Sequence, residues 1–254
     1  MSKCFKNNKR KNNYILKAIL KKEFNSFFAS PIAYLVIGVF LLINGLFLFI
    51  FNDDFNILNA GFADVTPFFY LAPWVFLFLI PAITMKSFAD EFNTGTIELL
   101  KTKPLSDWQI VLGKFTASLL LVTIAIIPTF IYVYTVYKLG NPIGNIDFGS
   151  TIGSYIGLLF LAATYTSIGL FTSTLSKNQI IAFILGVFIT FILFYGFDAI
   201  AASFEDSSLT IQKLGINEHF KSISRGVIDT RDILYFISVT VFFLFITKIR
   251  LDNE

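Results

Sequence analysis

The stretch IAYLVIGVFLLINGLFLFIF, from Ile32 to Phe51, carries no charged residue over its 20 positions. Crossing the hydrocarbon core of a bilayer, about 30 Å thick, takes about 20 apolar helical residues. All 20 Lys and Arg, all 17 Asp and Glu and the single His fall outside this stretch and five others like it. The five others are Phe68 to Met85, Ala117 to Tyr137, Ile152 to Thr172, Ile180 to Phe197 and Ile233 to Thr247. The sequence therefore predicts an all-α polytopic membrane protein with six transmembrane helices.

The sixth apolar stretch is the shortest, at 15 residues. We expect it to be completed by Lys248 and Arg250, whose long side chains can reach the interface, or by a locally thinner bilayer. Composition agrees with a membrane protein, because 55% of the residues are hydrophobic, 15% are charged and the mean hydropathy is +0.71. We expect two parts, an N-terminal region over residues 1–30 and one six-span domain over residues 31–254.

The distribution of positive charge predicts the orientation. Eight Lys or Arg precede the first apolar stretch, whereas residues 52–67 contain none and carry three Asp. With alternating spans, 15 basic residues fall on one side and five on the other. Because cytoplasmic segments are enriched in Lys and Arg, both termini are predicted to be cytoplasmic.

Before the first span, apolar residues recur at helical spacing, with polar residues opposite them. The apolar set is Leu16, Leu20, Phe24, Phe27 and Phe28, and the polar set is Lys17, Lys21 and Asn25. This pattern predicts an amphipathic helix in the cytoplasmic interface, ended by Pro31. A plain electrostatic anchor to anionic lipid is a compatible interpretation.

The segment between the second and third apolar stretches, Lys86 to Phe115, carries the most specific signals. Gly95 can end a helix in a left-handed cap, and Pro104 cannot continue a helix. Ser106 and Gln109 have the spacing of a capping box, which predicts that the helix feeding the third span begins there. A short cytoplasmic helix is therefore expected between two bends, presenting Glu98 and Lys101 together with apolar Ile97, Leu99 and Leu100.

This segment resembles the cytoplasmic motif of ABC transporter permeases of the type 2 exporter class. The matching residues are Glu91, Gly95-Thr96-x-Glu98-Leu99-Leu100, Pro104 and Gly113-Lys114. The N-terminal amphipathic helix is similar to the elbow helix of that class, and His219 to Asp232 is similar to a further signature. Within the class, Glu23 to Tyr34 and Pro67-x-x-x-Leu71-Ala72-Pro73 most resemble the F subunits of gliding-motility (Gld) ABC transporters, although permeases for copper-enzyme maturation share much of the pattern.

The resemblance implies a permease domain in a bacterial inner membrane, driven by a separate cytoplasmic ABC ATPase subunit that receives the short helix in a cleft. The residues assigned to ATPase coupling are Glu91, Thr94, Gly95, Thr96, Glu98, Leu99, Leu100 and Pro104. It also implies a homodimer, or a heteromer with a related membrane subunit. The alternative for this segment is a solvated amphipathic loop that only joins two spans.

The chain itself is not expected to be an enzyme. It contains no G-x-x-x-x-G-K-[ST] phosphate-binding motif, no H-E-x-x-H and no G-x-S-x-G, and the glycines from Gly140 to Gly149 lack the Lys that a phosphate cradle needs. We expect no cofactor, metal or nucleic-acid partner. The charge-free centres of the spans disfavour an ion-coupled carrier. A membrane scaffold that uses an ATPase for assembly or mechanical work remains an alternative to transport.

Two further features concern packing. Gly149, Gly153 and Gly157 repeat every four residues and predict a helix face that another helix approaches closely, from either the same chain or a partner. Pro81 and Pro128 lie within the second and third spans, where they are expected to disturb the helix. The polar segment from Asp198 to Asp232 is expected to form short helices, which in the resembling class are re-entrant near the outer leaflet. For His219, a surface or packed position is expected rather than a catalytic one.

Overall fold

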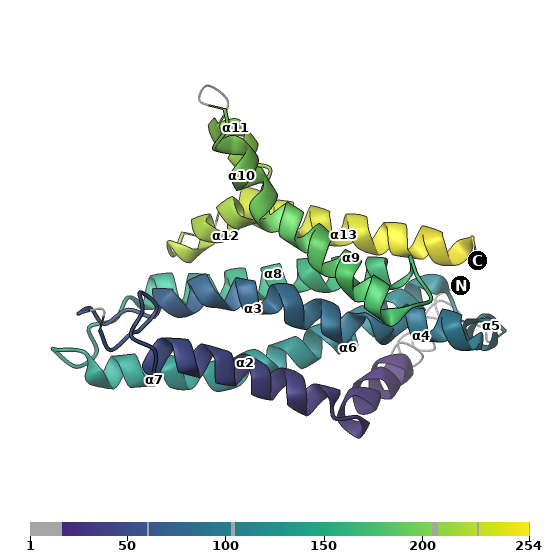
Figure 1. Ribbon diagram of the computed structural model, residues 1–254, viewed down its shortest axis with the longest axis horizontal. Coiled ribbons are helices and arrows are strands. Elements are labelled where there is room, and N and C mark those ends of the chain that lie inside the picture. Colours follow the sequence, from purple (N-terminus) through teal and green to yellow (C-terminus); the bar gives the residue numbers. More distant parts are fainter. Residues whose placement is uncertain (1–16, 60, 103–104, 205–207, 228, 254) are drawn as a thin grey trace, which may run out of the picture.

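The computed structural model describes residues 17–59, 61–102, 105–204, 208–227 and 229–253, which form helices joined by short connections (Figure 1). Six helical segments are long and apolar enough to cross a membrane, as predicted. They are Ile32–Phe49, Thr66–Thr94, Asp107–Leu139, Phe148–Ser173, Gln179–Ala201 and Thr230–Asp252. The chain is therefore an all-α, multi-pass membrane protein.

The elements follow one another as six spans with short helices at both ends. They are α2 (Ile32–Phe49), α3 (Thr66–Thr84), α4 (Lys86–Thr94), α5 (Thr96–Lys101), α6 (Asp107–Ile126), η1 (Ile127–Thr129), α7 (Phe130–Leu139), α8 (Phe148–Ser173), α9 (Gln179–Phe191), η2 (Ile192–Gly196), α10 (Phe197–Ala201), α11 (Ser208–Gln212), α12 (Ile216–Ser224) and α13 (Thr230–Asp252). Residues 17–29 form a further helix, here called the N-terminal helix.

The N-terminal helix is amphipathic as expected. Lys17, Lys21 and Asn25 are exposed, whereas Phe27 and Phe28 are partly buried against the main core. Leu16 and the basic residues before it lie outside the described residues. The N-terminal helix, α5 and the end of α13 lie at the same end of the bundle, at the right of Figure 1. We call this the α5 end.

Helix α8 is the centre of the bundle. It packs against α3, α6, α9, α12 and α13, and 72% of its span is buried, compared with 22% for the span that contains α9. The core around it is apolar and aromatic, with Phe40, Phe68, Phe76 and Tyr165 fully buried. In water, the burial of apolar area stabilises such contacts by about 25 cal/mol per Å². In lipid, close packing and hydrogen bonds hold the helices together.

Two spans change helix type along their length. Pro128 lies in the 3₁₀ turn η1, which separates α6 from α7, because proline cannot donate the α-helical hydrogen bond. Pro81 lies inside α3, as does Pro73. In the fifth span, α9 passes into the π-helix η2 before α10 begins. At Pro128, where a kink is expected, the structure has a 3₁₀ turn within a span that stays helical, and at Pro81 it has uninterrupted α-helix.

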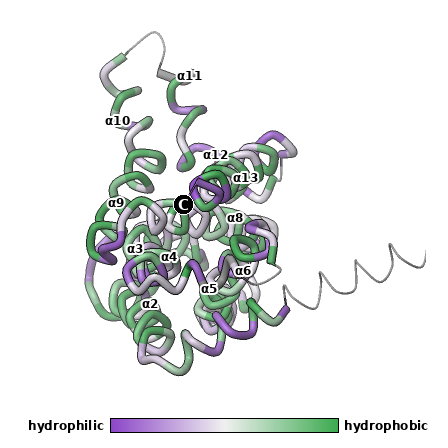
Figure 2. The backbone as a smooth tube through the Cα atoms, turned by 90° about the vertical axis from the view of Figure 1, so that its right-hand side faces the viewer, coloured by the Kyte–Doolittle hydropathy of each residue, from purple (hydrophilic) through white to green (hydrophobic). Residues whose placement is uncertain are grey.

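Short helices occupy the polar segment that precedes the last span, as predicted. Helices α10 and α11 stand off from the bundle, both in Figure 1 and in the view along the helices in Figure 2. Helix α12 instead lies against α8. The final span is longer than its apolar stretch, because α13 extends over 23 residues and includes Arg250 in its last turn.

The stripe of small residues on α8 is used within the chain. A Cβ atom added at Gly153 would lie 2.6 Å from the carbonyl oxygen of Ile223, and one at Gly157 would lie 3.3 Å from the Phe220 ring. Gly149 lies next to Gly226, whose φ of +84° requires glycine. The partner of this face is therefore the end of α12.

Candidate functional site

The segment from Met85 to Phe115 forms two bends around a short helix, as the sequence predicts. Helix α4 ends at Gly95, which adopts the left-handed conformation with φ 70°. Helix α5 then extends from Thr96 to Lys101. At the second bend the capping box is present, and the Ser106 N–H donates to Gln109 Oε1 at 3.0 Å. Pro104 lies outside the described residues.

Ile97 anchors α5 to the bundle. Its side chain is 8% exposed and belongs to an apolar cluster at the α5 end. The other buried members come from α4, α6, α8 and α13, and they are Phe88, Ile110, Val111, Leu170, Leu244 and Leu251. The expectation that α5 presents Ile97 on its exposed surface was wrong, because this side chain is buried in an apolar cluster of its own chain.

The residues at the bend before α5 and at its beginning are exposed. Thr94, Gly95, Thr96 and Glu98 are exposed. The hydroxyl groups of Thr94 and Thr96 lie 3.0 Å apart, and Thr94 Oγ1 donates to the Asp90 carbonyl oxygen at 2.7 Å. The backbone of Leu99 and Leu100 belongs to α5, but their side chains lie outside what the structure describes. The arrangement leaves Glu98 as a carboxylate that a second protein can reach.

Glu91 occupies a different environment from Glu98. Its Oε1 atom lies 2.8 Å from Nζ of Lys114, and the two side chains are 13% and 3% exposed. Lys114 also donates to the carbonyl oxygen of Ser87 at 2.7 Å and lies 5.0 Å from the centre of the Phe88 ring. The carboxylate expected at a docking surface is thus already bound to a cation of its own chain.

The N-terminal helix joins the same cluster. Glu23 Oε1 lies 3.3 Å from Lys114 Nζ, so one buried ammonium group contacts carboxylates from two other helices. One turn earlier, Ile19 lies over Gly113, where an added Cβ atom would come within 2.5 Å of its side chain. The N-terminal helix therefore packs on α6 at Gly113 and Lys114. We call Glu23, Glu91 and Lys114 the charge cluster.

Comparison with known proteins decides the family. Residues 16–247 match the model of a protein family described as "ABC-2 family transporter protein". The chain belongs to the ABC-2 transporter family. No curated protein matches it. An ABC-2 family member is a permease, the membrane subunit of an ABC transporter, and the six spans of this chain agree with that role.

Sequence reasoning missed one part of the site in this ABC-2 permease. It treated Lys114 as a cytoplasmic charge and did not connect it with Glu23. A signal was present, because Glu23 is the only acidic residue before Asp53 in a strongly basic segment. A lone carboxylate among lysines indicates a specific partner more strongly than a general attraction to lipid.

At the opposite end of the ABC-2 permease, His219 is packed, as expected. Its Nδ1 atom lies 2.6 Å from Oδ1 of Asp232, its Nε2 atom lies 2.9 Å from the Lys213 carbonyl oxygen, and its ring stacks on Tyr235 with centres 3.9 Å apart. Asp232 is 5% exposed. These contacts hold α12 against the beginning of α13.

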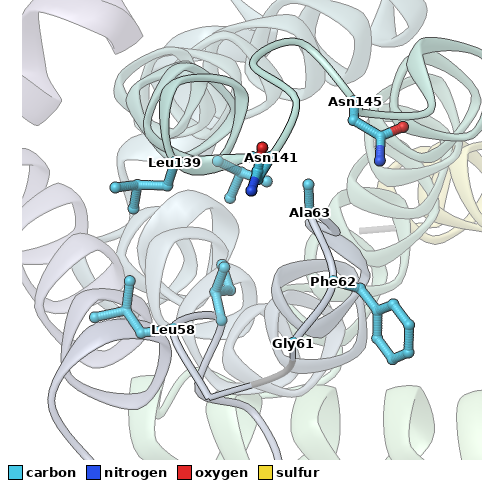
Figure 3. A pocket seen from close by; sticks show the side chains of 10 residues that line it. Leu58, Gly61, Phe62, Ala63, Leu139, Asn141 and Asn145 are labelled. Atoms are coloured by element: carbon cyan, nitrogen blue, oxygen red, sulfur yellow. The ribbon is translucent and has the colours of Figure 1, made fainter.

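A cavity of about 560 Å³ also lies at this end, between residues 57–63 and the end of α7 (Figure 3). Leu58, Phe62, Leu139, Asn141 and Asn145 are among its lining residues, none of which is charged. It offers two amides and apolar surface but no titratable group for catalysis or ion binding.

Proposed function

We propose that the chain is the permease subunit of an exporter-type ABC transporter in a bacterial inner membrane, driven by a separate cytoplasmic ATPase subunit. The observation that carries this proposal is the construction of α5. Gly95 ends α4 directly before this helix, the capping box begins α6 a few residues after it, and Ile97 is buried beneath it, while Thr96 and Glu98 are exposed. A rigid, exposed helix suits docking better than a flexible connector does.

We place the α5 end in the cytoplasm, together with both termini. Lys86, Lys114, Lys177, Lys248 and Arg250 lie in the elements of this end, and the positive-inside rule orients them towards the cytoplasm. The N-terminal helix then lies in the cytoplasmic interface, with its lysines towards anionic headgroups.

In this proposal the contact with the ATPase consists of Glu98 and Thr96, together with the Gly95 bend, Thr94, Leu99, Leu100 and Pro104. Glu91 acts behind this surface through the charge cluster. Movement of α5 passes to α4 and then to Lys114 on α6, since these side chains are bonded to one another. Rocking of the spans follows from a displacement of this connected group.

We further propose that the permease works as a dimer, either with itself or with a related membrane subunit. The spans that contain α2, α9 and α13 are the least buried, at 28%, 22% and 28%. They supply apolar faces for a second membrane subunit as well as for lipid. A role in gliding motility is the specific process we propose, supported by the resemblance of residues 23–34 and 67–73 to that subfamily.

Copurification tests the docking proposal. The tagged chain is isolated from native membranes in mild detergent, and bound proteins are identified by mass spectrometry for the wild type, Glu98→Lys and Asp252→Lys. Asp252 provides a matched control, because it is an exposed acid at the same end and pairs with Lys248, one turn earlier on α13.

We expect a P-loop ATPase with the wild type and with Asp252→Lys, and at least about tenfold less with Glu98→Lys, since like charges brought together at an interface cost several kcal/mol. Equal recovery with Glu98→Lys would remove α5 from the contact. Deletion of the chain in its own organism tests the process: loss of gliding supports the motility role, whereas intact gliding with loss of a copper enzyme replaces it.

A further inference from the structure

Two adjoining cavities lie at the end of the bundle opposite α5. The larger has a volume of about 550 Å³ and lies between the beginning of α3, η2, α10 and α12. The smaller, about 290 Å³, lies between α3, the beginning of α8 and α12. They share the lining residues Thr66, Phe69, Tyr70, Phe220 and Lys221. We treat them as one groove, here called the α3–α12 groove.

The two parts of this groove carry opposite charge. The larger cavity is lined by the carboxylates of Asp54, Asp64 and Asp198, with Lys221 as its one cation. The smaller is lined by Lys221 and Arg225 and by no carboxylate. The cavity in Figure 3 has a similar volume, about 560 Å³, but no charged lining residue. A cavity of this volume at this end of the bundle can therefore be lined without charged residues, and the charges are a particular feature of the α3–α12 groove.

The basic part has hydrogen-bond donors to offer. Lys221 Nζ lies 3.6 Å from Asp198 Oδ2, and Arg225 lies 4.0 Å from Glu218. Both distances exceed the length of a direct hydrogen bond, about 3.2 Å at most. Their side chains are 42% and 71% exposed. Ammonium and guanidinium groups in this state bind phosphate oxygens well.

The acidic part is bordered by aromatic rings. Tyr70, Trp74 and Tyr195 line the larger cavity and are 56%, 38% and 41% exposed. Trp74 and Tyr195 have ring centres 5.7 Å apart. Carboxylates together with exposed aromatic faces favour an organic cation, which gains both charge pairing and cation–π attraction.

The groove continues as an apolar track along α3. Tyr70, Trp74 and Phe78 follow at four-residue spacing on one side of the helix, and Phe78 is 55% exposed. From Thr66 to Phe78 the helix rises about 18 Å at about 1.5 Å per residue, which exceeds the hydrocarbon thickness of one leaflet, about 15 Å. Across from it, Phe191 lies 6.3 Å from Trp74 between ring centres. Such a track suits an acyl chain.

We propose that the α3–α12 groove binds a zwitterionic phospholipid, with the ammonium among Asp54, Asp64 and Trp74, the phosphate at Lys221 and Arg225, and an acyl chain along Trp74 and Phe78. The shared headgroup chemistry is a phosphate ester of ethanolamine. An anionic lipid lacks the cation for the carboxylates, and a purely cationic ligand would face Arg225. The proposal is independent of ATPase docking, and in the orientation proposed above the lipid comes from the outer leaflet.

The fluorescence of Trp74 provides the test. The chain has two tryptophans, and Trp108 lies on α6, which begins at the α5 end, so Trp108→Phe leaves Trp74 as the only indole. The full-length Trp108→Phe protein is placed in mixed micelles with increasing fractions of phosphatidylethanolamine or phosphatidylglycerol, both brominated on the acyl chains. Bromine quenches indole fluorescence on contact, so the two titrations report how each lipid occupies the groove.

We expect phosphatidylethanolamine to quench with about a three- to fivefold higher apparent affinity than phosphatidylglycerol, the size that exposed charge pairs and one cation–π contact give. Equal quenching, or stronger quenching by phosphatidylglycerol, would overturn the proposal. Addition of soluble glycerophosphoethanolamine separates the two sources of the headgroup. Recovery of fluorescence at low concentrations would replace the lipid with a soluble ligand, and no recovery would support the lipid.

Variants of the lining residues test whether the preference for phosphatidylethanolamine over phosphatidylglycerol arises in this groove. The double variant Lys221→Gln with Arg225→Gln should reduce this preference to less than about twofold. The double variant Asp54→Asn with Asp64→Asn should do the same. Lys213→Gln and Arg231→Gln are matched controls in the same segment, because neither residue lines the groove, and both should keep the preference. Arg225→Gln alone changes a side chain that is 71% exposed and is the variant least able to disturb folding. Retained preference in all groove variants would exclude this groove.

Discussion

Nζ of Lys114 on α6 lies 2.8 Å from Oε1 of Glu91 on α4, in a position where the lysine side chain is 3% exposed. Glu23 of the N-terminal helix lies 3.3 Å from the same ammonium group. A buried charge is tolerated only when it is paired, so these three side chains fix the relative positions of three helices. The short helix α5 follows directly from α4 and is held in place through it.

Lys114→Met should destabilise the permease more than any surface charge change. Removing the cation leaves the partly buried carboxylates of Glu23 and Glu91 with the exposed Lys22, at 3.5 Å and 4.0 Å, as their remaining ion-pair partner among the described residues, so the cost is at most about 3–5 kcal/mol. The measurement is reversible unfolding in mixed detergent micelles. Glu23→Gln and Glu91→Gln added to Lys114→Met should recover a large part of the loss, since the uncompensated charges are then gone. A loss below about 1 kcal/mol for Lys114→Met would mean that the cluster is hydrated and weak.

Gly113→Ala should displace the N-terminal helix. The new methyl group would lie 2.5 Å from the Cγ2 atom of Ile19, and overpacking of this kind costs about 1–3 kcal/mol. Ile19→Ala in the Gly113→Ala background should restore most of the stability, because it removes the atom that clashes. Gly38→Ala is the control, since nothing lies within 4 Å of its added methyl group.

Gly153→Ala should separate α12 from α8. Its methyl group would meet the carbonyl oxygen of Ile223 at 2.6 Å and the Cα atom of Gly226 at 3.0 Å. These are backbone atoms, which cannot rotate away, so we expect a larger loss in free energy of unfolding than for Gly113→Ala, about 3 kcal/mol or more. Gly45→Ala, which has open space, should change stability little. A tolerated Gly153→Ala would show that α12 is loosely attached.

His219→Ala should loosen the connection between α12 and α13. It leaves the Asp232 carboxylate, which is 5% exposed, without its partner, at a cost of about 1–3 kcal/mol in the free energy of unfolding. The double variant His219→Ala with Asp232→Leu should be more stable than His219→Ala alone, because no carboxylate remains to be buried. If the double variant is the less stable of the two, the Asp232 carboxylate stabilises the protein without His219, and the loss of their hydrogen bond does not explain the effect of His219→Ala.

Hydropathy and local helix signals predicted the large features correctly for physical reasons. A span needs a long apolar run, and Ile32 to Phe51 is one whatever its neighbours are. Gly95 and Ser106 act on the backbone within one turn, so the end of α4 and the beginning of α6, which flank the short helix, can be predicted from local sequence. The span boundaries were less accurate, because α8 begins at Phe148 and α13 at Thr230, where Asp147 and Asp229 cap the helices ahead of the apolar residues.

Contacts between distant segments could not be predicted in this way. The sequence indicates that Ile97 is apolar but not whether it faces a partner or the four helices that bury it. In the same way, Gly153 signals a close approach without naming Ile223 as the neighbour. The charge cluster joins residues 23, 91 and 114, and each of them has an ordinary local interpretation as a surface charge. Such pairings depend on the packing angles of the helices, which single-sequence patterns do not contain.

The 3₁₀ turn at Ile127–Thr129 divides the third span into two arms, α6 of 20 residues and α7 of 10 residues. The longer arm begins beside α5 and measures about 30 Å at about 1.5 Å per residue. Tilting an arm of that length by about 5° moves its tip by about 2.6 Å, roughly half of one helical turn. In the rocking motion proposed above, a pivot at Pro128 would make α6 a lever, because the shorter arm beyond the 3₁₀ turn could stay in place while the longer one tilts.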